Sequence, residues 1–190
     1  MTRLKKWIYW NPSDVGQFWD EKSSTKEDYY SFKHGKSIIG KIETMNLLHS
    51  SQSVLDYGCG PGYLMEHLST SGYRKVSGCD FSHESVKVAK ERFEPKGMKV
   101  FHIDECHEYR QLFDVIIVSE IIEHLYDNDL RLLLENIDGL LSDNGKVIFT
   151  TPNNEKIGNS ISFSENLNGF IHKWQHVRSW NKISIESWLA

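Results

Sequence analysis

The chain has 190 residues, of which 39% are hydrophobic and 25% charged, and its formal net charge is -4 at pH 7. This length supports one domain with a sizeable core, and the composition is that of an ordinary globular protein. The acidic balance argues against a nucleic-acid partner, because no overall positive field attracts phosphates. No apolar run reaches the length of a membrane span, and no apolar region of a signal peptide follows the basic start MTRLKKW.

The three cysteines also indicate the compartment of the protein. Cys59, Cys79 and Cys106 are odd in number and far apart, and no CxxC motif occurs. This pattern favours neither a disulfide framework nor a thiolate zinc site. A reducing, cytoplasmic setting is therefore expected.

Residues 1–35 are predicted to form an N-terminal arm that precedes a domain over residues 36–190. Periodicity in the arm is weak, but aromatic residues are dense. They are Trp7, Tyr9, Trp10, Phe18, Trp19, Tyr29 and Tyr30. Two interpretations stay open: the rings pack on the domain as apolar bulk, or the arm is a lid over a pocket.

From residue 36 onward, helical patterns alternate with short strands rich in valine and isoleucine. Helices are expected over 37–48, 62–72, 83–93, 128–141 and 183–190, the last with Ser184 as its N-cap. Strands are expected over 53–58, 75–80, 98–103, 113–119 and 146–151, with a turn at 143–145 leading into the last one. This alternation predicts an α/β fold with a doubly wound, mostly parallel sheet.

The first strand runs into a glycine-rich turn within VLDYGCGPGYL, residues 54–64. Gly58 and Gly60 allow a tight turn and a close approach of a ligand to the backbone, and Gly62 begins a helix whose free N–H groups favour a negative group. Tyr63 stands where a dinucleotide fingerprint needs its third glycine, and the Walker GK[ST] pattern is absent. Asp80, at the end of the second strand, suits the hydroxyls of a ribose. A nucleoside-bearing cofactor is therefore predicted, against the alternative of a tight turn without a ligand.

These motifs resemble those of class I S-adenosylmethionine-dependent methyltransferases. LDYGCGPGYL with CDFS is similar to their motif I and following acidic position, and FDVIIVSEIIEHL is similar to their fourth-strand motif. The resemblance covers about residues 36–150 and implies a Rossmann-like sheet of seven strands, and the C-terminal β-hairpin of that sheet is expected to be absent from these 190 residues. It implies S-adenosyl-L-methionine as cofactor and S-adenosyl-L-homocysteine as product.

The resemblance also assigns roles to individual residues. Asp80 takes the ribose, Phe81 lies on the adenine ring, and Asp104 and Glu105 reach the adenine edge, although Asp104 is equally explained as a solvated loop acid. The segment that holds the methionine part, with its flanking residues, comprises Asp56, Tyr57, Gly58, Cys59, Gly60, Gly62 and Tyr63. The remaining cofactor contacts are Ser82, Ser119 and Glu120, the last two on the cofactor floor.

The segment EIIEH follows the fourth strand. If it is helical, Glu120, Glu123 and His124 share one face, where they act as a base or hold a divalent cation. The plainer interpretation is that acidic residues complement a helix dipole and the histidine is a wall residue. Two histidines lie downstream, His172 and His176. The predicted catalytic residues are His124 and Glu120, and the predicted metal ligands are Glu120, Glu123, His124 and His176. A retained water shell favours magnesium, and a histidine-rich set favours zinc, manganese or iron.

Two groups of methyltransferases share this arrangement. Ubiquinone-pathway O-methyltransferases carry a similar ExxEH, and small-RNA 3′-terminal 2′-O-methyltransferases carry ExxEH, a later histidine and a TPN segment, which TTPNNE at 150–155 matches. Methyl transfer to a small-molecule hydroxyl is the favoured prediction. RNA 3′-end methylation is the first alternative, and a non-catalytic cofactor-binding scaffold is the second. The last strand is expected to be an open edge, which a second copy in a homodimer would cover.

Overall fold

The computed structural model describes residues 6–7, 9–11, 14–15, 18–19, 26–164 and 169–189. The rest of the arm predicted over 1–35, including the side chain of Trp7, lies outside the described residues, as does Ala190 at the end of the last predicted helix. Among the described residues, no helix has the length and apolar character that crossing a bilayer requires.

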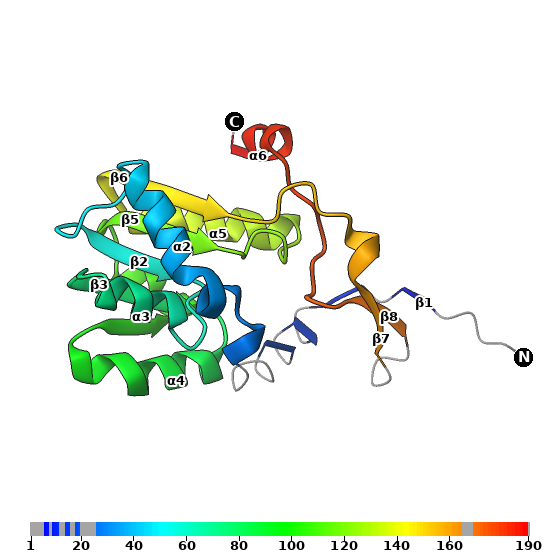
Figure 1. Ribbon diagram of the computed structural model, residues 1–190, viewed down its shortest axis with the longest axis horizontal. Coiled ribbons are helices and arrows are strands. Elements are labelled where there is room, and N and C mark those ends of the chain that lie inside the picture. The colour runs from blue at the N-terminus through cyan, green and yellow to red at the C-terminus, as the bar shows by residue number, and fades with distance from the viewer. Residues whose placement is uncertain are drawn as a thin grey trace, which may run out of the picture.

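Five parallel strands form the central sheet in the order β4-β3-β2-β5-β6 (Figure 1). They are β2 (Ser53–Tyr57), β3 (Lys75–Asp80), β4 (Lys99–His102), β5 (Phe113–Ser119) and β6 (Leu141–Thr150). The chain winds from β2 outward to β4 and then returns to β5 on the other side of β2. The reversal of strand order therefore lies between the carboxyl ends of β2 and β5, where sheets of this kind bind ligands. The α/β, doubly wound parallel fold is confirmed.

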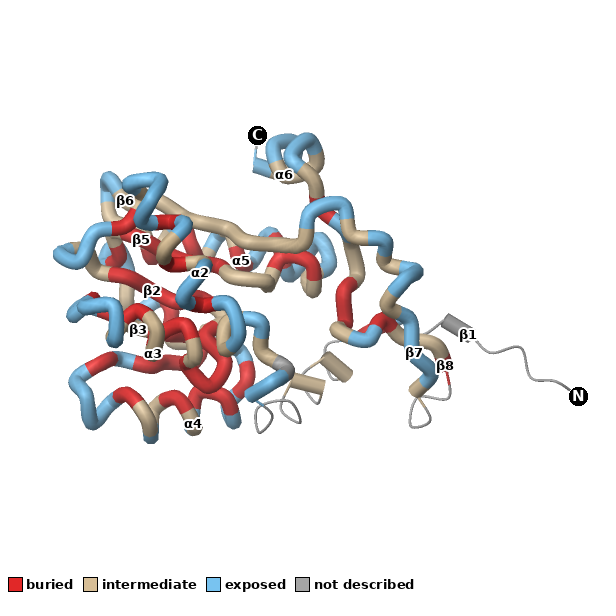
Figure 2. The backbone as a smooth tube through the Cα atoms, viewed as in Figure 1, coloured by how far each residue is buried: buried red, intermediate tan, exposed pale blue. Residues whose placement is uncertain are grey.

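Helices cover both faces of this sheet (Figure 1). One face packs against α2 (Tyr30–Thr44), α3 (Tyr63–Thr70) and α4 (His83–Phe93), and the other against α5 (Asp127–Leu140) and α6 (Lys182–Leu189). Alternate residues of each strand enter the two cores: Val54 joins the first and Leu55 the second. Figure 2 shows the result, with β2 and β5 buried and α6 largely exposed. The central strands are therefore near-continuous apolar runs, as a sheet buried on both faces requires.

Both ends of α2 and the N-cap of α6 differ from the expectation. The helix expected over 37–48 begins at Tyr30 and ends at Thr44, because Phe32 packs on Tyr63 and Gly35 sits against the ring of His67, contacts that no sequence period reveals. Asn46 then takes a left-handed φ of 54°, which stops the helix. The expected N-cap Ser184 is also wrong: Asn181 caps α6, since its Oδ1 accepts the Ser184 N–H at 2.9 Å while Ser184 Oγ accepts the Asn181 N–H at 2.9 Å.

The turn expected at 143–145 is absorbed into β6. Phe113 pairs with Leu141 and Val115 with Lys146, so residues 142–145 stand opposite a single residue of β5. The insertion is a bulge within one strand rather than a turn before it. β6 is the last strand of the sheet order, and the homodimer expected to cover this edge stays a prediction.

A second, small sheet was not expected from the sequence. It contains β1 (Lys6–Trp7), β8 (Gly169–His172) and β7 (Ile161–Ser164), with β7 and β8 antiparallel and β1 parallel to β8. These strands have two to four residues, which is too short for an alternating pattern to be recognised. Four 3-10 turns complete the described structure: η1 (Lys26–Asp28), η2 (Glu94–Lys96), η3 (Ile103–Glu108) and η4 (Ile157–Ser160). The antiparallel hairpin thus lies outside the central sheet, which has five described strands rather than seven.

Replacing Ile116 with alanine should lower the free energy of unfolding by about 2–5 kcal/mol, because Ile116 in β5 is 0% exposed and truncation leaves a cavity. Urea unfolding followed by circular dichroism measures the change. Ile183→Ala is the matched control, since Ile183 on α6 is 79% exposed and should change stability by less than about 0.5 kcal/mol. Equal losses in the two variants would contradict the buried position of β5.

Candidate functional site

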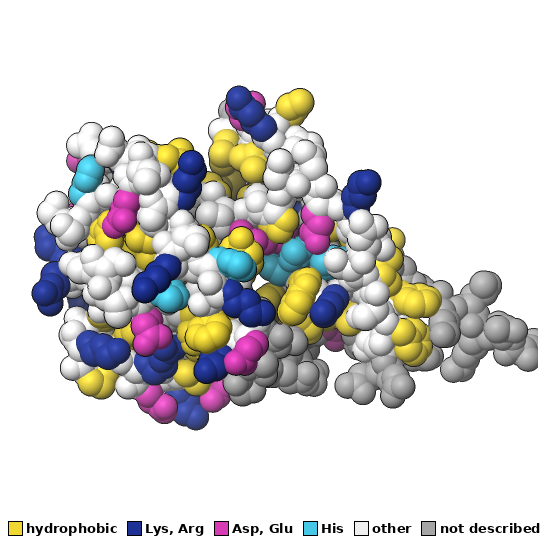
Figure 3. All heavy atoms as spheres, in the orientation of Figure 1, with side chains coloured by type: hydrophobic (Ala, Val, Ile, Leu, Met, Phe, Trp, Pro, Cys, Tyr) yellow, Lys and Arg dark blue, Asp and Glu magenta, His cyan; other side chains and the backbone are white. Residues whose placement is uncertain are grey.

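A cavity of about 640 Å³ lies at the carboxyl ends of the strands, at the point where the strand order reverses. Tyr57 and Asp80 end β2 and β3, and Ser119 ends β5; all three line it. Figure 3 shows histidine and acidic side chains gathered at the centre of one face, between the sheet and the β7–β8 hairpin. The cavity therefore joins the glycine turn to the histidine segment.

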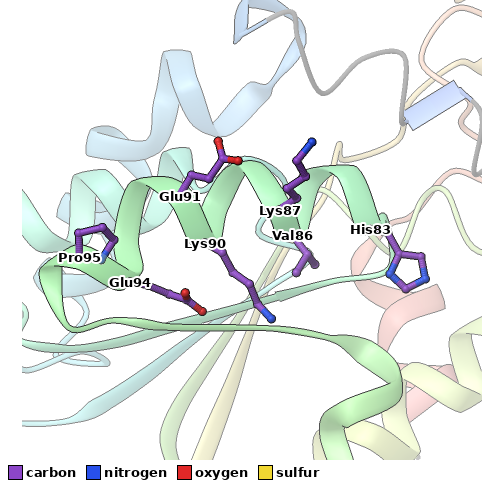
Figure 4. A pocket seen from close by; sticks show the side chains of 7 residues that line it. All are labelled: His83, Val86, Lys87, Lys90, Glu91, Glu94 and Pro95. Carbon is purple, nitrogen blue, oxygen red and sulfur yellow. The ribbon is translucent and has the colours of Figure 1, made fainter.

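A second, shallower hollow lies on the outer side of α4 (Figure 4). Its lining comes from one helix and the turn after it, and includes Lys87, Lys90 and Glu94. Charged side chains on a solvated helix face explain it, and no strand end contributes to it. The cavity at the sheet edge is therefore the candidate site.

The glycine turn has the backbone that the sequence predicts. Gly58 has a φ of 78° and Gly60 a φ of 52°, both in the left-handed region that side chains rarely adopt. A Cβ atom on Gly58 would lie 2.4 Å from Cδ1 of Ile121, and one on Gly60 would lie 2.6 Å from the ring of Tyr29. Glycine is thus required twice over, by conformation and by space.

Hydrogen bonds tie this turn to the end of β3. The N–H groups of Gly58 and Cys59 both donate to the carbonyl oxygen of Cys79, at 2.8 and 2.9 Å. The Gly60 N–H donates to Oδ2 of Asp80 at 2.8 Å, and Oδ1 of Asp80 accepts the Ser82 N–H at 2.9 Å. The Phe81 N–H also donates to this carboxylate, which offers about four lone-pair sites in total. Asp80 therefore both holds the turn and retains acceptor capacity toward the cavity.

The predicted cofactor residues divide into two groups. Those that line the cavity are Tyr57, Gly58, Gly60, Asp80, Phe81, Ser119 and Glu120. Those that do not are Asp56, Cys59, Gly62, Tyr63, Ser82, Asp104 and Glu105.

Among the residues outside the cavity lining, Asp56 and Ser82 hold the helices that follow β2 and β3, whereas Asp104 faces solvent. Asp56 is buried and accepts the N–H of Met65 near the start of α3. Ser82 is the N-cap of α4, since its Oγ accepts the Ser85 N–H at 3.0 Å. The Asp104 side chain is 83% exposed and lies 3.2 Å from Nδ1 of His102, as the solvated-loop interpretation expects.

The EIIEH segment is a turn and not a helix. Glu120 has a φ of 56°, a left-handed conformation that is costly for a glutamate and turns the chain sharply after β5. Its Oε1 accepts the hydroxyl of Thr150 at 2.8 Å, and Oε2 of Glu123 accepts the hydroxyl of Thr151 at 2.9 Å. The two carboxylates are therefore held by neighbouring residues at the end of β6.

Two groups of side chains have the spacing of metal ligands. Glu123, His124 and His176 form the first, and Glu155, His172 and His176 the second, with the ligand atoms of each group within 4.8 Å of one another. Neither group contains Glu120, so the structure brings together three of the four predicted ligands. Oε1 of Glu123 and Nδ1 of His124 in the first group, and Nε2 of His172 in the second, are buried and have no hydrogen-bond partner among the described residues. Buried ligand atoms that have this spacing and lack hydrogen-bond partners fit a cation site.

Burial also removes charge from the first group. It raises the pKa of Glu123 to about 8, with the nearby Glu120 carboxylate adding to the effect. It lowers the pKa of His124 to about 3, with His176 adding to the effect. Burial raises the pKa of Glu120 as well. Near neutral pH the imidazole of His124 is thus neutral, the form in which histidine binds metals.

Two residues of the arm also reach this site. The Trp19 indole N–H donates to Oε1 of Gln175 at 3.0 Å, and the Trp19 ring meets His124 edge-on at 5.1 Å. Tyr29 lies between Trp19 and the glycine turn. These rings pack on the domain and line its cavity at once, so both interpretations of the arm describe part of the arrangement, and its action as a lid stays a prediction.

Sequence reasoning missed Glu155 and Gln175 and left His172 out of the ligand set. Glu155 ends the segment TTPNNE, and His172 and His176 are four residues apart. The acid at the end of this segment and the four-residue separation of the two histidines are the features of the sequence that could have indicated a shared site. The hairpin β7–β8, which places His172, has no comparable signal in the sequence.

Comparisons with known proteins show the family of the chain. A family model described as "Methyltransferase domain" matches residues 33–190. The mitochondrial ubiquinone biosynthesis O-methyltransferase of Rattus norvegicus is 31% identical over 143 residues, covering 70% of this chain and 40% of the rat protein. The malonyl-[acyl-carrier protein] O-methyltransferase of Bacillus anthracis is 30% identical over 121 residues, covering 63% and 44%. The chain thus spans less than half the length of these curated relatives.

Solved structures share the fold. The DhpI–SAH complex has a TM-score of 0.63 and 14% identity, covering 92% of this chain and 83% of that one. At this identity the likeness concerns the fold alone.

The Asp56→Asn variant should change how stability depends on pH. Burial, and next the charge of Asp80, raise the pKa of Asp56 from 3.8 to about 8. A carboxyl whose pKa is raised by folding contributes most below its unfolded pKa, and this contribution is lost as pH rises through the folded value. The free energy of unfolding of the variant should therefore rise relative to that of the unchanged chain between pH 3.8 and about 8.

Urea titrations across this pH range measure the difference. Asp138→Asn, at an exposed position of α5, makes the same chemical change at the surface and should follow the unchanged chain. A difference for Asp56→Asn that stays constant or falls with pH would be the contrary result.

Proposed function

Because the chain belongs to the class I S-adenosylmethionine-dependent methyltransferases, we propose that it transfers a methyl group from S-adenosylmethionine to a hydroxyl oxygen of a small molecule. One observation carries this proposal. A single cavity is lined by Gly58, Gly60 and Asp80 at one part and by Glu123, His124 and His176 at another. This lining supports the proposal, because a methyl donor bound at the first part would share one enclosure with the groups proposed to activate an acceptor.

The donor side of the cavity fits a nucleoside with a charged tail. Asp80 keeps acceptor capacity for the ribose hydroxyls, and the glycine turn offers a backbone surface free of side chains. Phe81 follows Asp80, is 40% exposed, and lines the cavity where an adenine ring would find an apolar face. These three features support binding of S-adenosylmethionine and of its product S-adenosylhomocysteine.

Transfer from a sulfonium is an in-line displacement. The bond from the methyl carbon to the acceptor oxygen forms as its bond to sulfur breaks, and the neutral thioether product leaves. The hydroxyl proton must go to a base. We assign this proton to Glu120, which lines the cavity and whose pKa is raised by burial, so that its carboxylate is a stronger base than an ordinary one. His124, with a pKa lowered to about 3, is poorly suited to the same task.

The group Glu123, His124 and His176 is proposed to hold a divalent cation. The convergence of unpaired buried atoms on Glu123 and His124 supports this assignment. Two imidazoles and one carboxylate favour zinc, manganese or iron over magnesium, which prefers oxygen ligands. When bound, such a cation lowers the pKa of an acceptor hydroxyl.

The acceptor side of the cavity favours a small, largely apolar molecule. Leu125, Leu132, Leu133 and Trp174 contribute to its lining. Lys33 is the one lysine among the described lining residues, and none of them is arginine. Neutralising a phosphate backbone requires more positive charge than this.

Asp80→Asn should weaken binding of S-adenosylhomocysteine about 10- to 100-fold, because a charged acceptor in a buried site is lost. Isothermal titration calorimetry of the chain with S-adenosylhomocysteine provides the affinity. Asp143→Asn, on an exposed part of β6, should bind as the unchanged chain does. If the unchanged chain shows no heat of binding, or if both variants bind equally well, the cofactor assignment fails.

Glu120→Gln should lower turnover by about 10²- to 10⁴-fold with little effect on the affinity for S-adenosylhomocysteine, because the amide accepts no proton. The assay measures release of S-adenosylhomocysteine with a panel of phenols, aliphatic alcohols and carboxylates. Glu135→Gln, on the exposed face of α5, is the matched control. Turnover with carboxylates alone would refute the hydroxyl acceptor, and full activity of Glu120→Gln would refute its role as base.

A further inference from the structure

We propose that Glu155 and His172 are positioning residues that fix the imidazole of His176, and that the cation site is Glu123–His124–His176 and not Glu155–His172–His176. Both groups have ligand spacing, and His176 belongs to both. Hydrogen bonds around the three histidines decide between them. This inference rests on the cation proposed above.

His172 is excluded as a ligand by the donors that surround it. Its Nδ1 lies 3.0 Å from the backbone N–H of His176 and 3.4 Å from that of Trp174. A backbone N–H only donates, so Nδ1 must carry a lone pair and the ring proton must be on Nε2. A protonated nitrogen has no lone pair for a metal. His172, which is 0% exposed, is therefore held as an Nε2–H donor.

The proton of His172 faces Glu155. Nε2 of His172 lies 3.5 Å from Oε1 of Glu155, and Oε2 of the same carboxylate lies 2.5 Å from Nδ1 of His176. Glu155 thus has an imidazole nitrogen on each side: it forms a hydrogen bond with Nδ1 of His176, and it lies in a longer contact with Nε2 of His172, which has no hydrogen-bond partner among the described residues. The short contact to Nδ1 assigns the proton of a neutral His176 to that nitrogen. The lone pair of His176 is then on Nε2, as a metal ligand requires.

The small sheet explains how these residues come together. His172 is the last residue of β8, and the chain then turns so that its N–H groups come back to the His172 ring, with the Lys173 N–H donating to the Ser160 carbonyl at 2.7 Å. The rings of His172 and His176 stack at 4.5 Å with 23° between their planes. Gln175 anchors the same turn, because its side-chain amide donates to the carbonyl of His124 at 3.1 Å. The hairpin therefore presents one ligand to the sheet edge and supplies the residues that orient it.

Cobalt(II) is the probe that separates the two groups, because its visible absorption reports the ligand set while titration reports affinity. Glu155→Gln should bind one Co²⁺ per chain about 10- to 100-fold more weakly than the unchanged chain, with unchanged band positions. His172→Asn keeps an acceptor oxygen near the place of Nδ1 but loses the Nε2–H group that faces Glu155 at 3.5 Å. The His172→Asn variant should also keep the visible absorption bands of bound Co²⁺ at their positions. Its loss of affinity for Co²⁺ should be smaller than that of Glu155→Gln. His124→Asn removes a ligand and should abolish binding or shift the bands.

His107→Asn is the matched control, since the His107 side chain is 68% exposed and should leave both affinity and bands unchanged. Thermal melts by circular dichroism establish that each variant folds, and Glu155→Asp replaces the amide variant if that one does not. Loss of binding or shifted bands in His172→Asn, with normal bands in His124→Asn, would overturn the proposal. So would wild-type affinity in Glu155→Gln.

A titration of the same chain with S-adenosylhomocysteine separates this inference from the proposed function. If the unchanged chain binds S-adenosylhomocysteine but no Co²⁺, the cation and its positioning residues are refuted while the methyltransferase proposal stands. If it binds neither, both are refuted.

Discussion

The cavity depends on the hydrogen bonds that join the glycine turn to the end of β3. The N–H groups of Gly58 and Cys59 share the carbonyl of Cys79, and Gly60 donates to Asp80. These bonds hold two neighbouring parallel strands and the start of α3 in one geometry at the point where the strand order reverses. A side chain at Gly58 or Gly60 would break this arrangement, because the backbone is left-handed and Ile121 and Tyr29 fill the adjacent space.

The second constraint is electrostatic. Burial keeps Glu123 protonated and His124 uncharged near neutral pH, so neither compensates the other and one atom of each has no hydrogen-bond partner among the described residues. Such an arrangement lowers stability unless a ligand satisfies it. A cation that displaces the Glu123 proton would satisfy both unpaired atoms. The proposed binding site thus explains why the chain keeps these groups buried although their burial lowers its stability. In the proposed arrangement Glu155 determines which nitrogen of His176 carries a proton, and His172 lies against the other oxygen of the same carboxylate.

Much of the fold was predictable because its signals are local. The apolar runs of β2 and β5 and the amphipathic pattern of α5 repeat with the periods that strands and helices require. Errors occurred where a distant contact decided the outcome. α2 begins seven residues earlier than expected because Phe32 packs on Tyr63, and the expected turn before β6 became a bulge because residues on both sides of it pair with β5.

The sequence by itself determined the order of elements, the glycine turn, the acid at the end of β3 and the family, because each of these is written in adjacent residues with a fixed spacing. The tertiary structure alone decided which of the carboxylates and imidazoles meet. Glu120 was expected among the metal ligands. The backbone at Glu120 is left-handed, so the segment expected to be a helix is a turn, and Glu120 belongs to neither group of possible ligands. Glu155 and His172 join the cluster through β6 and through a hairpin whose strands of four residues carry no recognisable period. Contacts between residues far apart in the chain depend on how elements pack, and no local pattern encodes them.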